Sequence, residues 1–305
     1  MADRFFTEQE LDGLSRTPRQ QVVDCLEAGG AVGPLVASIA RSYRDQIGGS
    51  RSWVGWVFAH IGDRHGYEGL EAAIATTSRF FGALAAVGEK IRDVEGLTDD
   101  SDAVVGEMTD RARADDLLGA LAVFDAFENA CRVLQDAYRD WLSSLLSEVY
   151  RRWGPDELED LHRYCAERTL LPWMTVDIRN TPRKRLIRWV RMLQGHFSVV
   201  RAGEDDEKFV LVQDPCGTCS RQLLAGRCDP PFNLAVVEEE HLLTWGRGST
   251  PVYRTHVPVW HIAMARERLG VPWPVNRCPA GLGTGPCPTF LYKDPLDARA
   301  NEQVP

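Results

Sequence analysis

The chain has 305 residues, of which 44% are hydrophobic and 26% are charged, and its formal net charge is −9. This length and hydrophobic content suffice for two domains or one large core, and the negative charge argues against binding to nucleic acid. The sequence opens without a charged leader, so we do not expect secretion. It has no stretch of about 18 apolar residues, so we expect neither a membrane-spanning helix nor binding to a membrane. We therefore expect a cytoplasmic protein, whose thiols stay reduced.

The first half of the chain carries helix signals. Thr7, three residues before a glutamate, forms a capping box and predicts a helix start. Between Val32 and Ile47, apolar residues recur at steps of three and four and so share one helical face, and the glycine pair at 48–49 is expected to end that helix. Further helices are expected at 51–62, 67–92, 102–120, 121–152 and 155–171.

The pattern changes near residue 175, where strand and loop signals begin to alternate with helix signals. We predict an α+β protein with an N-terminal all-helical bundle, residues 1–175, followed by a small metal-binding α+β domain, residues 176–305. In chain order, this second domain is expected to hold a helix at 181–194, a hairpin of strands at 197–200 and 209–212, a helix at 257–269 and a strand at 289–292.

Five of the eight cysteines lie between Cys216 and Cys287, and three histidines lie among them. Soft thiolates and imidazoles gathered in one stretch are the ligands that zinc prefers, and in a reducing compartment a metal explains them better than disulfides. The other three cysteines sit apart in apolar helical patterns and are expected to be small buried hydrophobes: Cys25, Cys131 and Cys165.

Cys216 and Cys219 form a Cys-x-x-Cys motif directly after a predicted strand. Pro215 before the pair and Gly217 within it favour a tight turn that can direct two sulfurs to one point. A redox pair is one alternative, although no thioredoxin-like βαβ pattern surrounds the motif. Two unrelated buried thiols are the other alternative.

His256 stands at the end of a predicted strand or loop, just before the helix that carries His261. From such a position an imidazole can reach a metal held by a neighbouring loop. The two histidines are five residues apart and point to different helical faces, so they are not expected to be joint ligands. His261 is either an ordinary helix residue or an acid–base group near the metal.

Cys278 and Cys287 bracket a glycine-rich loop, and Cys287 enters an apolar strand. The loop lacks the Gly-Lys-Ser/Thr ending of a phosphate-binding loop and no helix follows it, which argues against nucleotide binding. Its glycines are expected to let the backbone fold closely around a metal or a ligand.

Three of these motifs in their order resemble an uncharacterised group of bacterial proteins with a cysteine- and histidine-rich C-terminal half. The motifs are Asp-Pro-Cys-Gly at 214–217, Tyr-x-x-His at 253–256, and Pro-Cys with Tyr-Lys-Asp-Pro at 286–295. The segment from Cys278 to Phe290 is also similar to the end of 4-vinyl-reductase-like domains, which are small α+β ligand-binding modules.

This resemblance covers roughly residues 180–295 and implies Cys216, His256 and Cys287 as site residues. Arg254 and Val257 stand where further cysteines often stand in that group. The resemblance therefore does not imply a closed site of four cysteines.

We predict a zinc site formed by Cys216, Cys219, His256 and Cys287, with Cys228 and Cys278 as alternative ligands. Without Cys219, a coordination position stays open for a water, whose pKa the metal would lower to generate a nucleophile. Candidates to shuttle its proton are His261, Glu240 and His241; the acidic run at 238–240 is otherwise a solvated turn.

Lys184, Arg188 and Arg191 share one face of the helix expected at 181–194. This basic face either binds an anionic substrate or an acidic partner, or is a solvated surface paired with the acidic bundle. Tryptophans near the cysteines, including Trp245, Trp260 and Trp273, line either an aromatic pocket or an ordinary core.

The leading functional hypothesis is a zinc-dependent enzyme, a hydrolase or lyase, that acts on a small molecule by metal-assisted hydrolysis or addition/elimination. The alternative is a non-enzymatic ligand-binding or sensory protein, in which a closed zinc site holds the loop-rich half together and the helical half forms a homodimer or meets another partner. A third interpretation is a haem-dependent oxygenase with His60 or His65 as the iron ligand.

Overall fold

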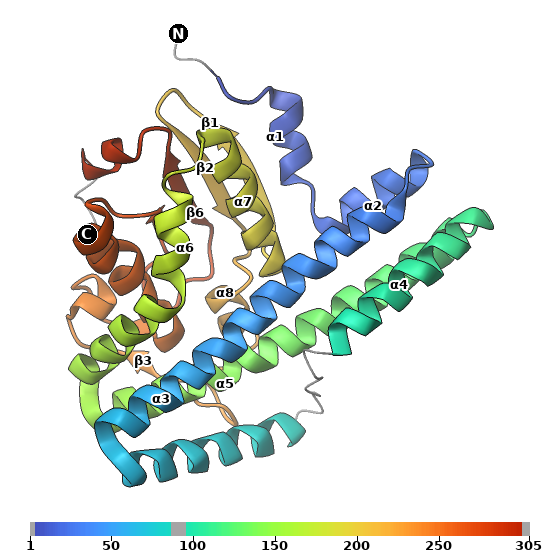
Figure 1. Ribbon diagram of the computed structural model, residues 1–305. Coiled ribbons are helices and arrows are strands. Elements are labelled where there is room, and N and C mark those ends of the chain that lie inside the picture. Colours follow the sequence, from blue (N-terminus) through green and yellow to red (C-terminus); the bar gives the residue numbers. More distant parts are fainter. Residues whose placement is uncertain (1–3, 87–95, 301–305) are drawn as a thin grey trace.

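The structure, a computed structural model, describes residues 4–86 and 96–300. Two long helices, α3 (Val32–Ala86) and α5 (Leu117–Arg168), lie side by side through the whole length of the bundle (Figure 1). Three shorter helices complete this half of the chain: α1 (Glu8–Ser15), α2 (Pro18–Glu27) and α4 (Gly96–Arg113). The predicted helical bundle is confirmed.

Local sequence signals explain where these helices begin and bend. Thr7 forms the predicted capping box at the start of α1. The predicted end at residues 48–49 is wrong, because α3 continues through both glycines and breaks at Gly66, whose φ is 59°. In the same way α5 breaks at Gly154, with φ 88°, directly before a proline. The last residues of the helix predicted at 67–92 lie outside the described part of the chain.

The second half is built around an antiparallel sheet in the order β1-β2-β6-β5. The predicted hairpin is confirmed: its first strand begins three residues later than expected, and its second covers the expected residues 209–212. The four strands are β1 (Val200–Glu204), β2 (Lys208–Gln213), β5 (Val275–Asn276) and β6 (Cys287–Tyr292). A second, two-stranded sheet joins β3 (Val236–Val237) to β4 (Thr250–Pro251).

Helices connect this sheet to the bundle. The predicted helix at 181–194 is α7 (Pro182–Gly195), which Thr181 caps. The helix predicted at 257–269 forms as a π-helical segment, η3 (Pro258–Met264), followed by α9 (Ala265–Leu269). The remaining helical segments are α6 (Leu170–Asp177), α8 (Cys219–Leu224), η1 (Leu242–Thr244), η2 (Val252–Thr255) and η4 (Pro295–Ala300).

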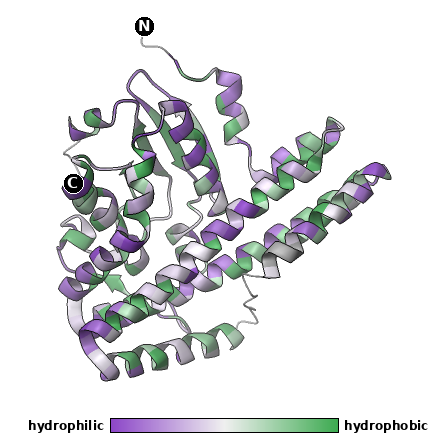
Figure 2. Cartoon of the chain, in the orientation of Figure 1, coloured by the Kyte–Doolittle hydropathy of each residue, from purple (hydrophilic) through white to green (hydrophobic). Residues whose placement is uncertain are grey.

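One buried core runs from the bundle into the sheet. It joins Val54 and Leu145 of the long helices to Trp260 and Leu291 of the second half, so apolar packing continues across residue 175. Figure 2 shows hydrophobic and hydrophilic residues interspersed along the long helices, as in amphipathic helices that bury one face. Within residues 4–86 and 96–300, no helix is long and apolar enough to cross a membrane.

Candidate functional site

A cavity of about 670 Å³ lies between the helical bundle and the α+β half. Its volume falls within the range typical of small-molecule sites. Helices α3, α5 and α7 supply one part of its wall, and the ends of β2 and β6 with the segments around η2 and η3 supply the other. Four cysteines and three histidines line it: Cys216, Cys219, Cys278, Cys287, His196, His256 and His261.

Sheet pairing brings the Cys-x-x-Cys motif to Cys287. Gln213, the last residue of β2, pairs with Cys287, the first residue of β6. The loop after Gln213 is held by Gly217, whose N–H donates a 2.8 Å hydrogen bond to Ser198 Oγ. A Cβ at Gly217 would lie 1.9 Å from the carbonyl oxygen of His196. Only glycine lets the loop pass this close, and that passage places Cys216 in the cavity wall.

Cys278 and Cys287 form a second thiol pair, with 3.8 Å between their sulfurs. Arg254 holds the loop that joins them, because its guanidinium donates hydrogen bonds of 2.6, 2.7 and 2.9 Å to the carbonyls of Pro279, Gly281 and Gly283. The Arg254 side chain is buried. The predicted close backbone packing at this loop is therefore organised by a cation inside it.

The thiols influence one another electrostatically. A hydrogen bond with Cys216 and the positive charge of Arg254 lower the pKa of Cys219 to about 5. The same hydrogen bond, together with burial, raises the pKa of Cys216. The pKa of Cys287 is raised by its contact with Cys278, by burial, and by the charges of Cys216 and Cys219. These thiols thus act on one another, and Cys219 carries negative charge more readily than Cys216 or Cys287.

Arg139 of α5 is a second buried cation beside the thiols. Burial lowers its pKa to about 10, and the charges of Cys216 and Cys219 act in the opposite direction. Its Nη2 donates a 2.6 Å hydrogen bond to His196 Nδ1, and its guanidinium lies 5.1 Å from the ring centre of Tyr253. Within the described residues, its Nε has no hydrogen-bond partner. The thiol end of the cavity therefore carries excess positive charge.

The imidazoles in the cavity wall are neutral near pH 7. Burial, with the nearby His261, His162 and Arg139, holds the pKa of His256 well below its usual value. Burial also lowers the pKa of His261 to about 4. His256 Nδ1 donates a 2.6 Å hydrogen bond to the Tyr253 carbonyl, which leaves Nε2 as an acceptor.

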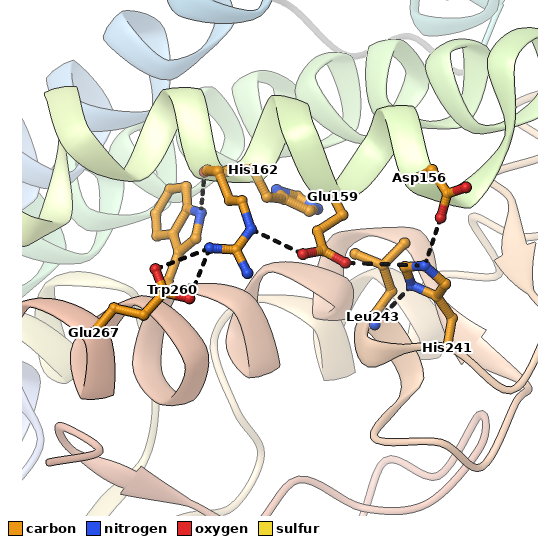
Figure 3. A network of polar contacts seen from close by, with 8 residues as sticks. Asp156, Glu159, His162, His241, Leu243, Trp260 and Glu267 are labelled. Carbon is orange, nitrogen blue, oxygen red and sulfur yellow. Dashed lines mark hydrogen bonds and ion pairs between the residues drawn. The ribbon is translucent and has the colours of Figure 1, made fainter.

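The remaining predicted site residues lie elsewhere. Glu240 is exposed, and neither it nor His241 or Cys228 lines the cavity. Figure 3 shows His241 reaching Asp156 and Glu159 on α5; the first contact is a 3.0 Å hydrogen bond to Asp156 Oδ1. His241 therefore fastens η1 to the bundle.

His60 and His65, the candidate haem ligands, also lie outside the cavity wall. Each places its Nε2 2.9 Å from the same carboxylate oxygen of Glu157. The ring of His65 is stacked on Trp153, with 3.8 Å between the ring centres. Both imidazoles thus join the two long helices close to their glycine bends.

All four predicted zinc ligands, Cys216, Cys219, His256 and Cys287, line the one cavity, and Cys278 joins them. Across the described part of the chain, no three or more His, Cys, Asp and Glu side chains stand in the arrangement of a formed metal site. The thiols stand instead as two contacting pairs.

Several cavity residues come from the helical half and were not predicted from the sequence. These are Arg41 and Trp53 of α3 and Arg139 of α5. Arg188 and Arg191 also line the cavity; they lie on α7 in the second half, on the basic face that the sequence offered as a possible anion-binding surface. The basic pattern of α7 was the available signal for the last two. Isolated arginines and tryptophans in amphipathic helices carry no comparable signal.

Comparison with known proteins identifies no relative of this chain. No protein-family model matches the chain, and neither the curated proteins nor the solved structures provide a match.

Proposed function

We propose that the chain binds a small molecule in the cavity beside a zinc centre formed by the thiols of Cys216, Cys219, Cys278 and Cys287. The observation that carries this proposal is the convergence of two thiol pairs on one cavity wall. In this proposal Cys278 takes the place that the sequence pattern assigned to His256. Cys278 contacts Cys287, whereas His256 contacts aromatic rings, His261 and the Tyr253 carbonyl.

The distance between Cys278 and Cys287 supports a tetrahedral site. A zinc–sulfur bond of about 2.3 Å implies roughly 3.8 Å between two sulfurs of a tetrahedral centre. The observed separation is 3.8 Å. A cysteine side chain has a single torsion with three staggered positions, and rotation about it would turn the sulfurs of the other pair toward the metal.

The charge around the thiols also supports a metal–thiolate centre. Four thiolates and one Zn²⁺ carry a net charge of −2, and burial of that charge requires compensation. Arg254 and Arg139 supply two positive charges beside the thiols. Among the described residues Arg254 forms no ion pair with a carboxylate; its hydrogen bonds go to three carbonyl groups and to Cys219.

The zinc content of protein purified without chelators tests the proposal. We expect one zinc per chain, and its loss in Cys216→Ser and in Cys287→Ser. Cys228→Ser is the matched control, because Cys228 lies in the same half of the chain but outside the cavity wall. Cobalt substitution gives a second readout, since thiolate-to-cobalt absorption reports the number of thiolate ligands. Zinc-free protein, or zinc that persists in both serine variants, would overturn the proposal.

Catalysis on the bound molecule is a second candidate, which the neutral imidazoles of His256 and His261 favour. Each has a lowered pKa and can accept a proton at neutral pH. A four-thiolate zinc has no open position, so the acid–base groups would act without a metal-bound water. The test uses a substrate that the wild-type chain converts. If His256→Gln keeps its zinc but loses kcat on this substrate, the catalytic role is supported. An unchanged kcat would contradict it.

A further inference from the structure

We infer that the cavity selects anionic small molecules with a flat unsaturated part, held by an arginine rim against tryptophan walls. This inference rests on the small-molecule binding proposed above and names the class of ligand. It draws on the cavity residues that the zinc proposal leaves without a role, which are the arginines of α3 and α7 and the aromatic side chains.

Away from the thiols the cavity wall is cationic, although the whole chain carries a net charge of −9. Among the described residues that line it, Asp45 is the one acidic residue and none is a lysine. A hollow lined by one sign of charge concentrates ligands of the opposite sign. Five arginines line it: Arg41, Arg139, Arg188, Arg191 and Arg254. Arg139 and Arg254 offset the charge of the thiols, so Arg41, Arg188 and Arg191 are the ones that remain for a ligand.

Two of these arginines stand exposed at the rim. Arg41 of α3 and Arg191 of α7 form no ion pair with a carboxylate in the described part of the chain. The helices that carry them are held together at this point, because Ser42 Oγ donates a 3.0 Å hydrogen bond to the Arg191 carbonyl. The two guanidinium groups are thus anchored on adjoining turns of packed helices and available to an anion entering the cavity.

Arg188 continues the cationic surface inward from the rim. It is half-buried, its guanidinium lies 4.9 Å from the ring centre of Trp173, and its Nη1 is 3.8 Å from Asp177 Oδ1. That separation leaves hydrogen-bonding capacity on the guanidinium, which binds carboxylates and related anions in a bidentate manner.

Flat aromatic side chains form the inner walls. Trp53 and Trp260 lie with 4.3 Å between ring centres, and Trp173 meets Trp189 edge to face at 5.1 Å. All four tryptophans line the cavity. Such surfaces favour planar, unsaturated ligands, whose faces they can cover without loss of side-chain entropy.

The cavity's positive charge does not depend on histidine. His196 and His256 have pKa values far below their usual range, with burial as the main cause and Arg139 also contributing. The acidic groups that face α3 and α7 here are Asp45 in the wall and Asp177 behind Arg188. Arginine stays protonated throughout the working range of pH, so affinity for a permanent anion is expected to stay constant between about pH 7 and pH 9.

Three isosteric probes test the inference: 2-naphthoate, 2-naphthamide and 2-naphthylmethylammonium. Their binding to the full chain is followed by tryptophan fluorescence and checked by calorimetry. We expect 2-naphthoate to bind at least about tenfold more tightly than the neutral amide, and the cation to bind most weakly. Raising the salt concentration should weaken binding of the anion but not of the amide.

Variants at the rim connect the preference to named residues. The double variant Arg41→Gln, Arg191→Gln should lose about tenfold in affinity for 2-naphthoate, and Arg41→Lys, Arg191→Lys should recover part of it. Lys184→Gln is the matched control, because Lys184 is exposed on α7 and does not line the cavity. Both arginines are exposed, so circular dichroism should confirm unchanged folding.

Equal affinity for the anion and the amide, absence of binding by all three probes, or an unchanged affinity in the double glutamine variant would overturn the inference. Zinc is measured on the same samples. Zinc present without preference for the anion would reject the ligand class and leave the metal centre standing. Preference for the anion in zinc-free protein would support the ligand class and reject the metal centre.

Discussion

Gln213 and Cys287 face each other across β2 and β6, and this pairing places the Cys-x-x-Cys loop beside the second pair of cysteines. The two pairs lie 59 residues apart in sequence, from Cys219 to Cys278. Antiparallel register, not a local motif, thus assembles the group of four thiols. The same register turns the thiols toward the arginine of α5.

Gly217→Ala is expected to destabilise the fold by about 1 to 3 kcal/mol, because a Cβ would collide with the carbonyl of His196. Urea unfolding measures the change. Gly48→Ala is the control, since a Cβ at Gly48 meets nothing within 4 Å and α3 is helical there. That variant should gain stability by about 0.5 to 1 kcal/mol. Equal effects at the two positions would contradict the close packing of the loop.

Glu157→Gln is expected to lower stability by about 1 to 3 kcal/mol, because Glu157 is buried and accepts hydrogen bonds from both His60 and His65. Burial alone would raise the pKa of Glu157, and the two histidines lower it below the usual value. Thermal unfolding provides the measurement. Glu68→Gln is the control. The Glu68 carboxylate is exposed and lies 3.6 Å from Arg152, so its replacement should change the free energy of unfolding little.

Stability is expected to fall below about pH 6, with His162 as one cause. Burial lowers the pKa of His162 from 6.5 to about 3, so the folded state keeps it neutral while the unfolded chain takes up a proton. The contribution of neutral His162 to the free energy of unfolding is complete above pH 6.5. It is lost as the pH falls toward 3, at a limiting slope of about 1.4 kcal/mol per pH unit.

His162→Gln removes this titration, so the variant should lose less stability than the wild type between pH 6.5 and pH 4. Denaturant unfolding at a series of pH values measures both slopes. His162 Nε2 contacts Thr255 Oγ1 at 2.8 Å, and glutamine keeps a polar group that can reach this hydroxyl. Parallel pH profiles for the two proteins would show that His162 is not a source of the acid sensitivity.

Arg254→Gln is expected to release the loop between Cys278 and Cys287, because three carbonyls lose their donor. Arg254 is buried, so we expect a loss of several kcal/mol in stability together with reduced zinc content. Proteolysis should cut the variant within residues 279–286 faster than the wild type. Arg247→Gln, at an exposed position, is the control. Unchanged cleavage in Arg254→Gln would contradict the role assigned to this side chain.

Local patterns predicted much of the fold. The capping box at Thr7, the N-cap at Thr181 and the hairpin of β1 and β2 depend on neighbouring residues, and all three are present. The glycine pair at 48–49 failed as a helix end because buried side chains at Ile47 and Ser50 carry α3 past it. Tertiary packing there outweighs the low helix propensity of glycine.

The site was only partly predictable for a related reason. Cys216, Cys219 and Cys287 stand out by residue type, and they do line the cavity. The role of Arg139 is seen only in the fold, because its partners His196, Cys216, Cys219 and Tyr253 lie 57 to 114 residues away in the sequence. His241 was chosen for its proximity in sequence to the cysteines, yet its hydrogen bond to Asp156 holds it outside the cavity wall.

X-ray absorption at the zinc edge of the purified chain tests the central claim most directly, because it identifies the atoms bound to the metal. The proposal predicts one zinc with four sulfur neighbours at about 2.3 Å. Cys278→Ser should lower the zinc content, and the zinc that remains should have three sulfur neighbours; His256→Gln should leave both the content and the four sulfurs unchanged. The four-thiol centre would be contradicted if the atoms bound to zinc included a nitrogen, and if that set changed in His256→Gln but not in Cys278→Ser.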